Sequence, residues 1–194
     1  MKLRSESLVL VLAGISTFFV IVSATVVVRP RVAEWHHAQQ IRRDIESVVG
    51  SPLPLISAIS LNEDTLMIPR AGHVTVVAAF STTCPYCERN LPDLKDVIHA
   101  CTVEMYLLSK EPVHVLQSYW NRVGWPSDTA RGSVKLASLI NPDDFARSLH
   151  MRGTPDYAIS DYTGRIVHRV FGLTRYDEFV AYIRSAGSQT CTDL

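Results

Sequence analysis

The chain has 194 residues, and its 19 basic residues balance its 19 acidic residues, so the formal net charge is zero. A neutral chain lacks the concentrated positive charge of a dedicated nucleic-acid-binding protein. Hydrophobic residues make up 47% of the chain, which excludes a disordered polymer, and four cysteines are too few for a small disulfide scaffold. The composition therefore indicates a globular domain, with an excess of apolar residues near the N-terminus.

Residues 8–28 contain neither a charge nor a proline. At 1.5 Å per residue they cover roughly 30 Å as a helix, the thickness of a hydrocarbon core. They predict a single transmembrane helix within an N-terminal anchor at residues 1–30. The alternative is a cleaved secretory signal, although its apolar region is usually only about 7 to 15 residues long. Positive charges flank the segment on both sides and leave its orientation open.

Residues 31–54 are expected to form a helical stalk and a proline-containing linker. Ala38, Ile41, Ile45 and Val48 are spaced three, four and three residues apart, as on one face of a helix. The sequence Ser-Pro-Leu-Pro at 51–54 then predicts a stiff linker. Residues 55–194 remain as one domain, which is long enough to build its own core.

Within this domain, strand and helix patterns alternate. Continuous apolar, β-branched runs predict buried strands, and turn residues separate them from longer amphipathic stretches. Residues 55–61 form a short apolar stretch. We expect strands at 73–80, 103–108, 134–139, 156–160 and 165–171, and helices at 85–100, 112–123, 142–150 and 176–185. This order predicts an α/β fold with a mixed central sheet and helices on both faces.

Cys84 and Cys87 stand where a buried strand runs into a helix. Unpaired N–H groups and the positive end of the helix dipole stabilise a thiolate there, which lowers the pKa of Cys84 from its ordinary value of about 8.5. Pro85 suits the first helical turn, and Cys87 lies one turn away, so a disulfide can close without large backbone movement. Zinc is the alternative, but no second pair of cysteines or histidines has suitable spacing.

The sequence resembles the thioredoxin superfamily, and within it the membrane-anchored TlpA/ResA-like thiol-disulfide oxidoreductases of bacterial envelopes. The resemblance covers roughly residues 55–187. VVAAFSTTCPYCERNLPDL is similar to that family's strand, active-site loop and first helix, in which Pro92 matches the helix proline. GTPDYAISDYTGRIVHRVFG is similar to its cis-proline loop and closing hairpin, with Pro155 in the cis-proline position. Residues 113–141 resemble the extra helix and strand of these domains.

The resemblance implies a protein thiol-disulfide oxidoreductase. The exposed Cys84 thiolate would form a mixed disulfide with a substrate, and the buried Cys87 would resolve it. The resemblance also implies substrate contacts by four residues, namely Pro85, Tyr86, Thr154 and Pro155. No metal and no cofactor are expected.

Two positions depart from the family pattern. Thr83 stands where tryptophan usually precedes the first cysteine, and Ala78 stands where a buried carboxylate often assists proton transfer. The group that handles the proton of Cys87 is therefore unassigned, and Glu88 is better explained as a solvated partner of the helix dipole.

The implied location is a bacterial inner membrane, with a single span and the C-terminal domain in the periplasm or otherwise outside the cytoplasm. The implied partners are proteins with thiols or disulfides and a membrane redox partner, with no nucleic acid. The favoured direction is reduction, for example in cytochrome c maturation. The alternatives are a disulfide-forming oxidase and a non-catalytic thioredoxin-like binding or assembly module.

The family motif does not explain Cys101 and Cys191. In a thioredoxin-like sheet both would follow helices that run away from Cys84, so they would reach the same end of the domain. They are candidates for a structural disulfide. The alternative is a buried free thiol at Cys101 and an unpaired Cys191.

Overall fold

A computed structural model of the chain describes residues 29–70, 72–125, 131–187 and 191. The predicted transmembrane segment at 8–28 lies outside the described residues. Among the helices that are described, none has both the length and the apolar character needed to cross a membrane. The chain divides into two compact units, residues 1–43 and 44–194. Helix α2, Arg29–Val48, forms where the stalk helix is expected and continues into the second unit.

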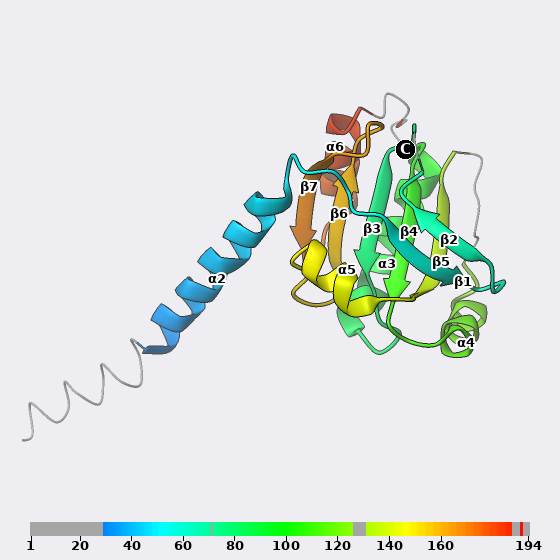
Figure 1. Cartoon of the computed structure of the whole chain (residues 1–194), viewed down its shortest axis with the longest axis horizontal. Coiled ribbons are helices and arrows are strands. Elements are labelled where there is room, and N and C mark those ends of the chain that lie inside the picture. The colour runs from blue at the N-terminus through cyan, green and yellow to red at the C-terminus, as the bar shows by residue number, and fades with distance from the viewer. Residues whose placement is uncertain (1–28, 71, 126–130, 188–190, 192–194) are drawn as a thin grey trace, which may run out of the picture. The chain divides into compact units, whose positions relative to one another are not determined.

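Within the described residues of the second unit, seven strands form one mixed sheet in the order β2-β1-β5-β4-β3-β6-β7 (Figure 1). The central strands β3, β4 and β5 run parallel, and β6 runs antiparallel to β3. The strands are β1 Ile56–Ser60, β2 Thr65–Ile68, β3 Thr75–Ala79, β4 Glu104–Ser109, β5 Ser133–Leu139, β6 Asp156–Ser160 and β7 Ile166–Phe171. The helices are α3 Pro85–Ala100, α4 Val113–Val123, α5 Pro142–Ser148 and α6 Tyr176–Ser185.

The predicted mixed sheet is confirmed, and each predicted strand and helix is present with ends shifted by a few residues at most. Strands β1 and β2 were not predicted. Strand β1 lies within the short apolar stretch at 55–61. Strand β2 is an edge strand paired with β1, and only Ile68 among its four residues is buried. Because burial on one face is what creates a recognisable pattern, so short and exposed a strand leaves little trace in the sequence.

Helices cover both faces of the sheet, because the side chains of the central strands alternate between two cores. Val76 and Ala78 of β3 belong to the core formed with α3, α4 and α6. Val77 belongs to the opposite core, which contains Phe145 of α5. Residues of the expected stalk and linker enter this second core.

The last turn of α2 and the expected linker pack into the domain. Val48 and Leu53 are both buried. The backbone N–H of Gly50 donates to Ile166 O at 2.7 Å, and that of Leu53 donates to Gly164 O at 2.8 Å. Residues 50–53 thus run beside the start of β7 and are part of the compact unit.

A disulfide joins Cys101 to Cys191 with an S–S distance of 2.06 Å. Cys101 is fully buried and ends α3, the helix that begins after Cys84, so the disulfide lies at the other end of that helix. It links two residues that are 90 positions apart. Closing so long a loop restricts the unfolded chain and stabilises the folded one.

Cys191→Ser should lower the free energy of unfolding by on the order of 4 kcal/mol, less any strain in the bridge. Denaturant unfolding of both proteins without reductant measures the difference, which should vanish when a reductant opens the bridge in the wild type. Two free thiols in denatured, unreduced protein that carries Cys84→Ser and Cys87→Ser would contradict the pairing.

Candidate redox site

The site begins where β3 ends and α3 starts. Cys84 is the N-cap residue of α3, with extended backbone angles, and Pro85 follows at the first helical position. The backbone N–H of Cys87 donates to Cys84 Sγ at 3.1 Å. The sulfur therefore takes the place that an oxygen of Ser, Thr or Asp usually has at a helix start. This arrangement directs the positive end of the helix toward the sulfur of Cys84.

Both cysteines are free thiols, and both are largely covered. Cys87 is 2% exposed, and Cys84, which we expected to be exposed, is only 9% exposed. The cover comes from a loop 70 residues away in the chain, because the thiol of Cys84 donates to Thr154 O at 3.2 Å. Cys84 thus keeps a narrow opening to solvent, while Cys87 lies behind it.

The two thiols differ sharply in acidity. Burial alone would raise the pKa of Cys84, but hydrogen bonds from Cys87, from the Thr154 side chain and from the backbone N–H groups of Cys87 and Tyr86 outweigh it and hold this pKa below its ordinary value. Burial raises the pKa of Cys87 to about 12, and its interaction with Cys84 adds to the rise. Cys84 is therefore the more acidic thiol of the pair, and the one that ionises first.

The predicted substrate loop lies beside the dithiol. The Thr154–Pro155 peptide bond is cis. Pro155 is buried, and its carbonyl accepts the backbone N–H of Gly172 at 2.9 Å, which ties the loop to the end of β7. Thr154 is the residue of this loop that reaches the sulfur of Cys84.

Tyr86 completes the set of predicted residues and differs from them in exposure. It lies in the first turn of α3 and is 53% exposed, and the guanidinium of Arg89 stands over its ring at 5.5 Å from the centroid. The structure thus brings Cys84, Cys87 and Thr154 into contact, while Pro85 and Tyr86 form the rim beside them.

Residues 61–187 match the family model described as a thioredoxin-like domain. The chain belongs to the thioredoxin-like family. Among curated protein sequences none matches it.

Solved structures share the fold at low sequence identity. The thioredoxin domain of a thiol-disulfide oxidoreductase from Bacteroides vulgatus is 18% identical with a TM-score of 0.59, over 71% of this chain and 96% of that one. A thio-disulfide isomerase from Thermus thermophilus is 22% identical with a TM-score of 0.58, over 75% and 99% of the two chains. StoA from Bacillus subtilis is 13% identical with a TM-score of 0.52, over 70% and 98%. These likenesses show the thioredoxin-like fold.

The thioredoxin-like core here carries two polar residues near the site that sequence reasoning missed. The first is Glu111, in the loop after β4. Its carboxylate accepts the Thr82 N–H at 3.0 Å, and the hydroxyls of Ser81 at 3.1 Å, Thr82 at 3.0 Å and Ser109 at 3.1 Å. Because β3 and β4 are parallel, the loops after both strands meet at one edge of the sheet, and this is the signal that could have revealed Glu111.

The second missed residue is Asn90, which is 1% exposed on α3. Its side-chain oxygen accepts the Thr174 N–H at 3.1 Å and the Tyr157 hydroxyl at 3.2 Å, and its amide donates to Thr174 O at 2.8 Å. Asn90 therefore fastens the first turns of α3 to the segment that precedes α6. Ala78, one of the two positions that depart from the family pattern, is buried on β3.

Glu111→Gln should loosen the loop that leads into Cys84. Burial would raise the pKa of Glu111, but the hydrogen bonds from Thr82, Ser109 and Ser81 lower it below the ordinary 4.5. A lowered pKa means that the stabilisation is complete above the unfolded-state pKa and is lost as the pH falls through the folded-state pKa. We expect the variant to lose about 1 to 2 kcal/mol of unfolding free energy at pH 7, and less at pH 3.

Denaturant unfolding at both pH values measures this effect. Asp144→Asn is the matched control, because Asp144 is an exposed carboxylate whose partner, Arg147, lies one turn along α5. Its removal should change stability by less than about 0.5 kcal/mol. A loss for Glu111→Gln that is the same at both pH values would contradict the assigned charge.

Proposed function

We propose that the protein is a membrane-anchored thiol-disulfide oxidoreductase that acts on envelope proteins through Cys84 and Cys87, mainly as a reductant. The observation that carries this proposal is the asymmetry of the dithiol. Cys84 caps a helix and has a lowered pKa, while Cys87 lies deeper with a pKa raised to about 12. A low-pKa thiol beside a buried partner is the arrangement that thiol-disulfide exchange requires.

In reduction, the Cys84 thiolate attacks one sulfur of a substrate disulfide. The Cys84–substrate S–S bond forms, and the other substrate sulfur leaves as a thiolate. Cys87 then loses its proton and attacks Cys84 Sγ, which closes the Cys84–Cys87 disulfide and releases the second substrate thiolate. The substrate gains two electrons and takes up two protons, and the protein loses two electrons. A membrane redox partner has to return them for another cycle, and no cofactor is needed.

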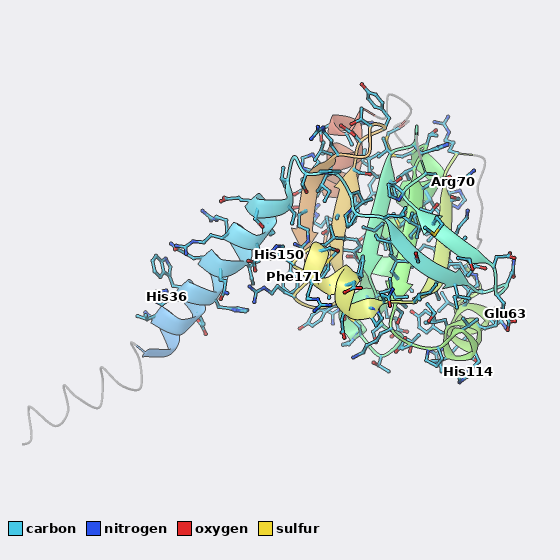
Figure 2. All side chains as sticks on the ribbon, viewed as in Figure 1. His36, Glu63, Arg70, His114, His150 and Phe171 are labelled. Atoms are coloured by element: carbon cyan, nitrogen blue, oxygen red, sulfur yellow. A yellow bond between two sulfur atoms is a disulfide. The ribbon has the colours of Figure 1, made fainter. Side chains whose placement is uncertain are left out.

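The surroundings of Cys84 suit a protein substrate. Three large apolar side chains, Tyr86, Phe171 and Leu173, are 42 to 53% exposed at the start of α3, at the end of β7 and just after β7. Figure 2 marks Phe171. Apolar side chains that are exposed beside a reactive group indicate a binding surface.

A groove of about 510 Å³ lies close to Cys84, because its lining includes Thr83, which precedes Cys84, and Thr154, which contacts the Cys84 sulfur. Leu108 and Phe145 are among its apolar lining residues. We propose that an extended substrate segment enters here and that Thr154 and Pro155 contact it. Recognition of an extended backbone together with apolar side chains fits a range of proteins rather than one small molecule.

The proposed cellular location rests on the N-terminal sequence and the family resemblance. Residues 8–28 are long and apolar enough for one span, and TlpA/ResA-like proteins place their thioredoxin-like domain outside the cytoplasm. We therefore propose a single-pass protein of the bacterial inner membrane whose C-terminal domain faces the periplasm or an equivalent compartment.

One observation favours the opposite direction of electron flow. A lowered pKa of Cys84 stabilises the reduced form, and a stabilised reduced form makes a dithiol pair more oxidising. A disulfide-forming oxidase is therefore the second candidate. Insulin reduction and oxidative refolding of a reduced protein separate the two, and a non-catalytic binding module would support neither reaction.

Cys87→Ala should accumulate mixed disulfides with envelope proteins, because Cys84 can still attack while nothing resolves the product. Affinity purification without reductant, followed by reduction and mass spectrometry, identifies the trapped partners. Cys84→Ala is the matched control and should trap none, because the remaining Cys87 is buried and burial raises its pKa above the ordinary value. Equal trapping by the two variants would contradict the assigned roles.

A further inference from the structure

The loop that covers Cys84 is fastened by a buried ion pair that the mechanism above does not use. Asp156 follows Pro155 and begins β6, and Arg169 lies on the adjacent strand β7. Their side chains are 0% and 1% exposed. Arg169 Nε donates to Asp156 Oδ1 at 2.9 Å, and Arg169 Nη2 donates to Asp156 Oδ2, so the contact is a two-point fork.

The same two residues also hold the beginning of the loop. The backbone N–H of Arg152 donates to Asp156 Oδ2 at 3.0 Å, and Arg169 Nη2 donates to the carbonyl of His150 at 3.1 Å. Figure 2 marks His150 near the start of this loop. Both ends of the segment 150–156 are therefore fixed to one point on the β6–β7 hairpin.

A further contact fixes the loop from outside. The side chain of Arg152 forms an ion pair with Asp44, in the last part of α2, with Arg152 Nε 2.6 Å from Asp44 Oδ2. Between the two anchored residues Arg152 and Asp156 stands Thr154, whose carbonyl accepts the thiol of Cys84. Any change in these ion pairs and hydrogen bonds would therefore move the carbonyl oxygen of Thr154, which contacts the sulfur of Cys84.

Stability alone does not account for a buried ion pair at this place. Removing two charges from water costs about as much as their attraction returns, and apolar replacements of such pairs are often neutral or stabilising. What a two-point guanidinium–carboxylate fork adds is a fixed geometry. Here that geometry applies to the loop whose Thr154 carbonyl accepts the thiol of Cys84.

We propose that Asp156 and Arg169 are positioning residues that hold Thr154 against Cys84 and thereby set both the reactivity of that thiol and the binding of the substrate. The inference rests on the proposed function. Substrate binding is included because Arg152, Gly153 and Thr154 line the groove beside Cys84, together with Ser81 and Lys110. A displaced loop would change the shape of the groove and the contacts of the sulfur at once.

The test compares the reduced full chain with a variant that carries Asp156→Asn and Arg169→Gln, a replacement that removes both charges and keeps a polar side chain at each position. Absorbance of the thiolate at 240 nm follows the titration of Cys84, which is separate from that of Cys87 near 12. We expect the midpoint of Cys84 to rise by about half a pH unit, because the hydrogen bond from the Thr154 side chain, which helps to hold this pKa below its ordinary value, is weakened. With a protein disulfide as substrate, KM should rise about fivefold, because the displaced loop lines the proposed binding groove, and kcat should change less.

Asp161→Asn is the matched control. Asp161 lies at the other end of the same hairpin, where its carboxylate accepts the N–H groups of Thr163 at 2.9 Å and Arg165 at 3.0 Å. Its replacement removes a hydrogen-bonded carboxylate far along β6 from Thr154 and should leave both the Cys84 midpoint and KM unchanged. If a less stable β6–β7 hairpin were the cause of a shift, Asp161→Asn would shift the Cys84 midpoint and KM as the double variant does.

Arg169→Lys is the second variant, and it tests the positioning role if the double variant does not fold. It keeps the buried positive charge and one hydrogen bond but loses the fork, so smaller shifts in the same directions are expected. A folded variant of either kind with the wild-type midpoint and KM would overturn the proposal. The titration needs no substrate, so a protein without exchange activity would refute the proposed function while the titration still decided the positioning role.

Discussion

The hydrogen bond from the backbone N–H of Cys87 to the sulfur of Cys84 is the interaction on which the site depends. It starts α3 at a cysteine instead of a serine or aspartate, and it places that sulfur in the positive field of the helix. The same turn of helix places Cys87 beneath Cys84, where burial raises the pKa of the second thiol to about 12. One local contact thus creates a reactive thiol and a protected partner from two identical residues.

The sheet then brings distant segments to this point. Because β3 and β4 are parallel, their ends deliver Cys84 and Glu111 to one edge, and because β6 is antiparallel to β3, its first residue, Asp156, pairs with the last residue of β3, Ala79. Thr154 therefore arrives beside Cys84 although 70 residues separate them. The topology explains why the loop that covers the nucleophile is fastened to the β6–β7 hairpin and not to α3.

The parts of the fold that could be predicted are those in which one local signal dominates. Strand β3 is a continuous β-branched run because it is buried on both faces, and α3 begins at a proline that follows Cys84. Strand β2 could not be predicted, because a short edge strand with one buried residue has no periodic pattern. Asp156 and Arg169 are only 13 residues apart, but their pairing depends on the register of the β6–β7 hairpin, which shifts between Ile159 and Ser160. Glu111 depends on Ser81 and Thr82, about 30 residues away, and Asn90 depends on Thr174, 84 residues away, so no short sequence window contains both halves of these contacts. The burial of Cys84 was missed for the same reason, since its cover is Thr154.

The central claim is that Cys84 and Cys87 form one reversible redox pair, and its reduction potential is the most direct measurement. The full chain would be equilibrated with glutathione or dithiothreitol buffers of known potential, and its free thiols would then be alkylated and counted. The account predicts a single two-electron transition between about −270 and −120 mV that disappears in Cys84→Ser and is insensitive to Cys191→Ser. Two cysteines that remain reduced across this range, or that oxidise independently of each other, would contradict it.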